Sequence, residues 1–288
     1  MKTNLLQAVF SVRGIGQSTQ DEAMTSELLE RTGAQTGRLR ANKSILKAGL
    51  AEWGKQVNRA RQWHVANTWQ GFGDTRILIP SEIERYKSAM DGHIQNIRYA
   101  YQTFISEYDH WKAQDRKALG AAYNDEDYPV RETLPDLFKT ELSIYPMPEP
   151  NQFLKDAVLG EHGKLLKEEY EQRLKDMTES VRRQILETFL LLIADTAKSL
   201  AEDEVIVDSE GRKGPVAKLR EYMDRVPALN SDNDPVISAI YSECRKSLDL
   251  STEILRNSKL HRNSAASTAV GIIEKFSGFG QSSRKLAA

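Results

Sequence analysis

A heptad repeat of apolar residues is the feature that most limits the folds open to this chain. From Met90 to Trp111 apolar and aromatic residues recur at alternating steps of four and three, along one helical face: Met90, Ile94, Ile97, Tyr101, Phe104, Tyr108 and Trp111. The segment 21–64 carries a second stripe at steps of three, four and seven residues: Leu39, Leu46, Leu50, Trp53 and Val57. Two such helices joined by a short connection pack antiparallel, because each buries its stripe against the other. The sequence therefore predicts a mainly α fold built on a long, coiled-coil-like antiparallel helical hairpin.

The second helix of this hairpin is expected to begin at Ser81, which has the spacing of a capping box with Glu84. Three short segments with strand character flank the hairpin: residues 5–13, 75–79 and 141–147. The last of them contains Pro146, which is typical of an edge strand because proline has no N–H to donate. Since a single strand is unstable alone, we expect a small sheet that caps the hairpin.

The second half of the chain predicts a C-terminal helical region. The expected helices cover residues 164–201, 216–223, 235–260 and 268–276, and a short strand is expected at 205–207. A brief helix near Leu134 to Phe138 is expected before this region. The chain then divides into residues 1–150 (strand, hairpin and small sheet), residues 151–262 (helical region) and residues 263–288 (a flexible basic tail).

Composition excludes several classes of protein. The formal net charge of −1 argues against a protein that coats nucleic acid, which usually has a strong basic excess. The single cysteine, Cys244, excludes an internal disulfide, favours a reducing compartment and is interpreted as a buried, inert thiol. No apolar run approaches the ~18–20 residues of a membrane span, so we expect a cytoplasmic protein.

Charge is unevenly distributed along the chain. Eight basic residues face one acid, Glu52, between Arg31 and His64: Arg31, Arg38, Arg40, Lys43, Lys47, Lys55, Arg59 and Arg61. The second hairpin helix and the segment after it lean acidic, and the C-terminal tail is basic again. This pattern allows three interpretations: pairing of the basic helix with the acidic one, within or between subunits; a phosphate-facing stripe for DNA or RNA; or an acidic protein partner.

Motifs that carry chemistry are sparse. Glu107 and His110 have the Glu-x-x-His spacing of di-iron helical bundles, but those sites need a second such pair and two more glutamates. The glycine pairs complete no nucleotide-binding loop, and no Gly-x-Ser-x-Gly elbow is present. We therefore expect no catalytic residues, no metal, no cofactor and no small-molecule substrate.

The order of the predicted elements resembles one family. The features that carry this likeness are a strand, two long helices on either side of an aromatic turn, and then Tyr128, Pro129, Leu134, Phe138, Pro146 and Pro148. Over roughly residues 5–200 the chain resembles an uncharacterised family of bacterial and bacteriophage proteins catalogued as domain of unknown function 3150. The resemblance implies a phage or mobile-element setting, with MoxR-type AAA ATPases and von Willebrand factor A-like proteins encoded nearby. It supplies no catalytic residue.

Three functions remain open on the sequence alone. The leading hypothesis is a non-enzymatic interaction or assembly protein that docks a partner helix or another copy of itself, with an AAA ATPase as one candidate partner. The first alternative is nucleic-acid binding through the basic residues between Arg31 and Arg61 together with the tail. The second alternative is a metal-dependent helical-bundle enzyme that uses Glu107 and His110.

Overall fold

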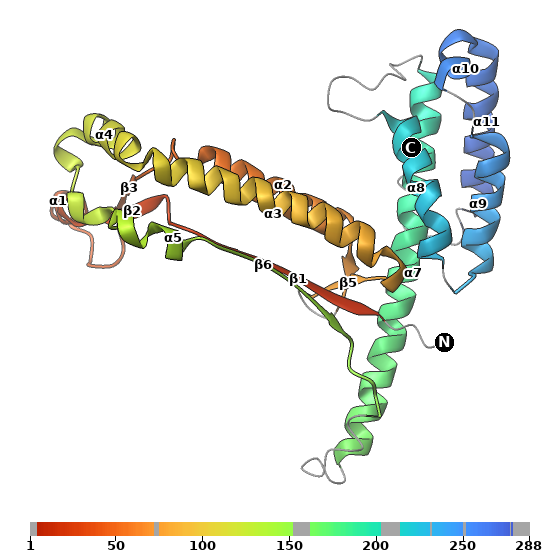
Figure 1. The fold of residues 1–288 in the computed structure, drawn as a ribbon, viewed down its shortest axis with the longest axis horizontal. Helices are drawn as coiled ribbons and strands as arrows, with labels where there is room; N and C mark the ends of the chain where they lie inside the picture. The colour runs from red at the N-terminus through yellow and green to blue at the C-terminus, as the bar shows by residue number, and fades with distance from the viewer. Residues whose placement is uncertain are drawn as a thin grey trace. The chain divides into compact units, whose positions relative to one another are not determined.

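The computed structural model describes residues 5–71, 75–151, 162–202, 214–230, 232–249, 252–276 and 278. They form a mainly helical fold with a small four-strand antiparallel sheet and a separate two-strand sheet (Figure 1). The chain divides into two compact units, each built from non-consecutive segments. We call residues 1–7, 69–83 and 146–288 the bundle unit, and residues 8–68 and 84–145 the ribbon unit. The mainly α class with a small sheet is confirmed.

The predicted first helix over residues 21–64 is wrong. That segment forms strand β2 (Ser18–Asp21), helix α1 (Glu22–Thr32), strand β3 (Ala41–Ser44) and helix α2 (Ala51–Ala66). Strands β2 and β3 pair antiparallel, with Ser18 opposite Ser44. Gly33 (φ +65°) ends α1 and Gly37 (φ +85°) turns the chain, in conformations that side-chain-bearing residues adopt only at a cost. These two glycines interrupt the segment that the sequence predicts as one long helix.

The second hairpin helix exists, but it is interrupted once. Helix α3 (Ile83–Ser106) is followed by helix α4 (Tyr108–Leu119), and Glu107 between them departs from helical geometry (φ −99°, ψ 11°). The backbone N–H of Trp111 still donates to the Glu107 carbonyl, at 3.1 Å. The capping box predicted at the start is absent. Instead, Ser81 lies in the short 3₁₀ helix η1 (Pro80–Glu82) and its Oγ donates to the Ala228 carbonyl at 2.7 Å.

Helices α2 and α3 pack antiparallel in the ribbon unit. Trp63, near the end of α2, contacts Tyr86 and His93 in the first half of α3, with ring centroids 5.6 Å apart in each case. Val57 and Ala60, earlier in α2, pack against Ile97, which lies later in α3. The hairpin therefore forms, but with a first helix much shorter than predicted (Figure 1).

The predicted seam is largely buried, but it is shared with strands. Its buried members are Leu46, Leu50, Val57, Met90, Ile97, Phe104 and Tyr108, and its half-buried members are Trp53, Ile94, Tyr101 and Trp111. Leu39 is exposed, and Leu46 is buried in a turn (φ +54°) outside any helix. The ring of Phe138 stacks on Tyr101 at 5.3 Å and meets the edge of Trp53 at 5.4 Å. The seam thus packs helices onto extended chain as well as onto each other, which a two-helix coiled coil does not do.

The four-strand sheet has the order β4-β5-β1-β6. Its strands are β1 (Leu6–Arg13), β4 (Trp69–Gln70), β5 (Arg76–Leu78) and β6 (Lys139–Pro146). The strands predicted at residues 5–13, 75–79 and 141–147 are therefore confirmed, and the Pro146 strand lies at an edge as predicted. Phe10 and Val12 of β1 pack under α2 and α3, against Val57, Ala60 and Ile97. The strand predicted at 205–207 lies outside the described residues.

Short helical turns connect α4 to β6. They are η2 (Gly120–Ala122), η3 (Asp125–Asp127), η4 (Arg131–Thr133) and α5 (Leu134–Leu137). The brief helix predicted at Leu134 is confirmed. Tyr108, Tyr128, Leu134 and Phe138 are all buried, so these turns close the core of the ribbon unit.

The bundle unit contains helices α7 (His162–Ala201), α8 (Pro215–Leu229), α9 (Pro235–Ser247), α10 (Thr252–Asn257) and α11 (Lys259–Phe276). The helix predicted at 164–201 is confirmed, and the one predicted at 235–260 is split into α9 and α10. Residues 263–276, predicted as part of a flexible tail, belong to α11 and bury Ala265, Ala269 and Ile272. The small side chains of Ala265 and Ala269 let α11 lie close against α7 (Figure 1).

Candidate partner-binding site

A cavity of about 380 Å³ lies in the bundle unit at the turn between α8 and α9. Apolar side chains from five segments form most of its wall: Leu5, Ile79, Val181, Ile185, Leu229 and Ile237. Thr178 and Arg182 of α7, together with polar residues of the α8–α9 turn, complete its lining. Ligand and anchor pockets in proteins have this character, an apolar interior with a few placed polar groups.

The α8–α9 turn is held by a network of side-chain hydrogen bonds. Asn230 Oδ1 accepts from the Asp234 N–H at 2.8 Å, and Asn230 Nδ2 donates to Ser238 Oγ at 2.9 Å. Asp234 caps α9, since its Oδ1 accepts from the N–H groups of Val236 and Ile237, both at 2.9 Å. Asn233 adopts φ +54°, a left-handed conformation that asparagine tolerates better than most residues. The hydrogen bonds of the Asn230 and Asp234 side chains therefore fix the rim of the cavity.

One ion pair lies on this rim. Arg182 of α7 pairs through Nη2 with Asp234 Oδ2; the Arg182 side chain is 54% exposed, whereas that of Asp234 is 8% exposed. The buried carboxylate is thus matched by two backbone donors and one guanidinium, which compensates its loss of water. Arg182 keeps a solvent-facing side at the mouth of the cavity.

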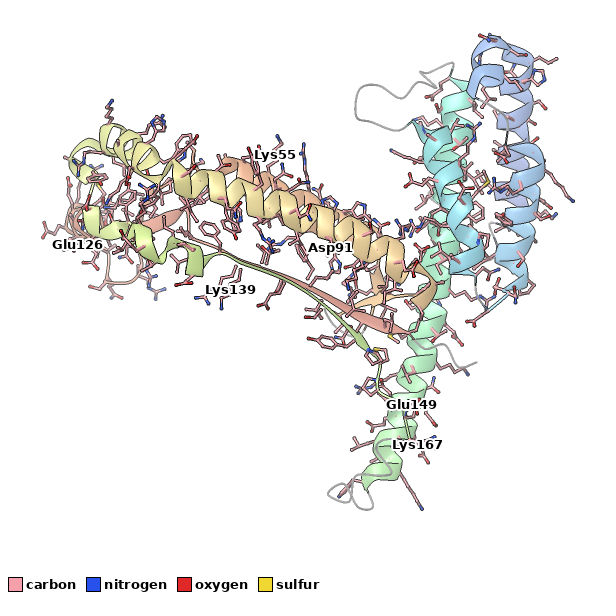
Figure 2. All side chains as sticks on the ribbon, in the orientation of Figure 1. Lys55, Asp91, Glu126, Lys139, Glu149 and Lys167 are labelled. Atoms are coloured by element: carbon pink, nitrogen blue, oxygen red, sulfur yellow. The ribbon has the colours of Figure 1, made fainter. Side chains whose placement is uncertain are left out.

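The basic residues predicted as a stripe do not share one helix. Arg31 lies on α1, Arg38 and Arg40 lie between α1 and β3, Lys43 lies in β3, and Lys47 precedes α2. Lys55, Arg59 and Arg61 lie on α2, and Figure 2 shows Lys55 on the side of α2 away from β1 and β6. All except Lys43 are exposed, and Lys55 pairs with Glu52 at 3.4 Å. The structure therefore divides the predicted stripe into separate groups.

Lys43 lies in a polar network within the ribbon unit. Its Nζ pairs with Asp127 at 2.7 Å, lies 4.0 Å from Asp21, and donates to the Ala122 carbonyl at 2.8 Å. The Lys43 side chain is 11% exposed. Asp115 completes the region, since its Oδ2 accepts from the Leu46 N–H at 2.6 Å and from Tyr128 Oη at 3.1 Å. At this position the basic segment pairs with the acidic one inside the molecule, as the first interpretation of the charge pattern predicts.

The residues considered for metal chemistry lie on the surface. Glu107 and His110 are exposed at the start of α4, and His110 Nε2 is 3.1 Å from Gln114 Nε2. Among the described residues no group of three or more His, Cys, Asp or Glu side chains is arranged to hold a metal ion. Within the same residues, no helix combines the length and hydrophobicity needed to cross a membrane.

Cys244 is fully buried in the core of the bundle unit, as its sequence context predicts. Burial raises the pKa of the thiol to about 12, and the nearby Glu243 carboxylate acts in the same direction. The thiolate that a nucleophile or metal ligand requires is therefore disfavoured at neutral pH.

Comparison with known proteins gave no match: no protein-family model, no curated protein and no solved structure matches this chain.

Sequence reasoning missed the cavity residues Arg182, Asn230 and Asp234. A local signal for the turn was present, because Asp234 followed by Pro235 has the pattern of an N-cap residue and a first helical proline. The position of Arg182 opposite that cap had no such signal. It depends on how α7 packs against α8, the helix that leads into the turn, and the sequence does not encode that pairing in any short motif.

Proposed function

We propose that this chain is a non-enzymatic assembly protein that binds a partner protein through the cavity at the α8–α9 turn. The observation that carries the proposal is an apolar cavity with a rigid, ion-paired rim. Interfaces obtain most of their binding energy where an aromatic or aliphatic anchor enters such a pocket and its rim excludes water. A partner helix that presents a leucine- or phenylalanine-type side chain has the required chemistry.

The seam of the hairpin is less suited to this role than the sequence suggested. Its residues Ile97 and Phe104 are covered by α2, β1 and neighbouring turns of the ribbon unit. A partner would have to displace those contacts before it could dock there. The α8–α9 cavity has the exposed side chain of Arg182 on its rim, so a partner can dock there without displacing the core of the bundle unit, which favours it as the docking site.

The biological setting is proposed from the family resemblance alone. It suggests a phage or mobile element and an AAA ATPase as a partner to test first. This chain would then be the bound component and not the motor, since its sequence contains no Gly-Lys-Ser/Thr phosphate loop.

The nucleic-acid hypothesis retains the exposed basic residues, but their separation weakens it. Arg38, Arg40 and Lys47 can be replaced by glutamine while Lys43 is kept, because only Lys43 belongs to the buried network. The hypothesis would be supported if the wild type binds labelled DNA or RNA at low salt and this triple variant does not.

Photo-crosslinking tests the proposed site. A benzoylphenylalanine at Thr178, which lines the cavity, is expected to capture a specific host protein that mass spectrometry identifies. The matched control places the same crosslinker at Thr103 on α3. Both threonines are helical and donate Oγ1 to the carbonyl four residues earlier, at 2.8 Å for Thr178 and 3.1 Å for Thr103. Capture of the same proteins from both positions, or from neither, would contradict the proposal.

A further inference from the structure

Strand β6 lies at one edge of the four-strand sheet and is eight residues long, whereas β4 at the other edge has two residues. Among the described residues, no hydrogen bond covers the side of β6 away from β1. Long, open edges are templates for another strand, and proteins usually shorten or block them.

The alternation of the backbone shows which groups of β6 are open. The N–H of Met147, just after β6, donates to the Leu5 carbonyl beside β1, at 3.1 Å. In a strand, the N–H and C=O groups of one residue point to the same side, and those of the next residue point to the opposite side. Thr140, Leu142 and Ile144 therefore direct both groups to the open edge. Pro146 falls in the same series and has no N–H, so it ends that row of donors.

A second cavity, of about 320 Å³, adjoins the same strand in the ribbon unit. It lies between α3 and the first half of β6, and it is lined by Ile94, Arg98, Tyr101, Phe138, Lys139, Thr140 and Glu141. Figure 2 labels Lys139 at this end of the strand. A strand added at the open edge would place a side chain opposite Thr140, on the face of the sheet where this cavity opens.

We infer that β6 pairs antiparallel with β6 of a second copy, with the two-fold axis at Leu142. In this register Thr140 lies opposite Ile144 of the second copy, and the open groups of the two strands form about six hydrogen bonds. Ile144 of each copy then enters the cavity between α3 and β6 of the other. The contact is isologous, so it closes as a dimer and leaves no new edge at β6.

Side-chain pairing across this register is favourable. Glu141 lies opposite Ser143 of the second copy, and Lys139 lies opposite Tyr145, whose ring is exposed. No like charges stand directly opposite each other, and lysine over a tyrosine ring is an attractive pair. The dimer does not rest on the proposed function, because it uses the ribbon unit and not the α8–α9 cavity.

A cysteine at the axis tests the register. In Leu142→Cys the two new thiols lie opposite each other, with Cα atoms about 5.5 Å apart, within disulfide range. The control Thr140→Cys places its two thiols about 13 Å apart along the strands, too far to bond. The native Cys244 is buried and contributes little background. We expect a disulfide-linked dimer from Leu142→Cys under mild oxidation and almost none from Thr140→Cys.

A proline at the edge tests the dimer without a crosslink. Thr140→Pro removes an outward N–H and leaves the β1–β6 ladder intact, so we expect a folded monomer by circular dichroism and light scattering, while the wild type is a dimer. A wild-type protein that is monomeric at concentrations on the order of 100 μM overturns the inference. Equal crosslinking of the two cysteine variants, or a Thr140→Pro variant that stays dimeric, also overturns it.

Discussion

The core of the ribbon unit is richer in aromatic side chains than the core of the bundle unit, which is mainly aliphatic. The bundle unit packs aliphatic residues such as Val181, Leu190 and Ile193, with small residues of α11 against α7. The ribbon unit packs rings, including Phe104, Tyr108 and Phe138, between helices and extended chain. Two helices of a bundle pack together when each carries a regular apolar stripe. Contacts between the rings of a helix and those of extended chain also require turns that bring the two segments together. Sequence periodicity therefore describes the bundle unit well and the ribbon unit incompletely.

The largest expected effects come from removing one ring from each core. Phe189→Ala in the bundle unit and Phe104→Ala in the ribbon unit each delete a side chain that is at most 1% exposed. Each should lower the free energy of unfolding by about 3–5 kcal/mol, through lost burial and a residual cavity. Calorimetry should show that the two variants lower the midpoint temperatures of different unfolding transitions. A single transition lowered equally by both would contradict the division into two cores.

Lys43 and Arg38 should differ although both belong to the predicted basic group. Lys43→Ala leaves Asp127 without its cation in a nearly buried site and should cost about 3 kcal/mol. Arg38→Ala removes an exposed side chain and should change stability by less than about 0.5 kcal/mol. Urea unfolding of the two variants measures this difference. Equal, small effects would show that the Lys43 network contributes little to the ribbon unit.

Alanine substitution at two glycines of the ribbon unit should change the stability in opposite directions. Gly37→Ala forces a side chain into φ +85° and should cost about 1 kcal/mol. Gly54→Ala lies within α2, where an added Cβ meets nothing within 4 Å, and should stabilise by about 0.5–1 kcal/mol. Thermal melts of both variants test the turn that replaces the predicted long helix. Stabilisation by Gly37→Ala would contradict that turn.

Helix stripes, strand alternation and Pro146 were sufficient to predict α3, α7, β1 and the edge position of β6. The segment 21–64 was mispredicted because Leu39 and Leu46 continue the helical spacing by coincidence, one exposed in a loop and one buried in a turn. Gly33 and Gly37 lie inside that predicted helix, but their positive φ angles turn the chain there. Candidate site residues were less predictable still. Arg182 and Asp234 are distant in sequence and meet only through helix packing.

The smallest expected effect is a pH dependence in the ribbon unit. Burial lowers the pKa of His93 below its ordinary value of 6.5, so the folded state binds its proton less readily than the unfolded chain. This contribution to stability is complete above about pH 7 and is lost as pH falls through 6.5 toward the lowered pKa. His93→Gln should therefore show a smaller drop in melting temperature between pH 7.5 and pH 5.5 than the wild type. An identical drop in the two proteins would exclude His93 as the source of the pH dependence.

The central claim is that the α8–α9 cavity receives a side chain of a partner protein. The most direct test begins with the partner protein that photo-crosslinking identifies, purified on its own. Its affinity for the wild type, Thr178→Phe and Thr103→Phe is measured by calorimetric titration. The first substitution fills the cavity, and the second adds the same ring to an exposed position of the ribbon unit. We predict that Thr178→Phe weakens the affinity roughly 30-fold or more, while Thr103→Phe leaves it within about twofold. Unchanged affinity in a folded Thr178→Phe variant would contradict the claim.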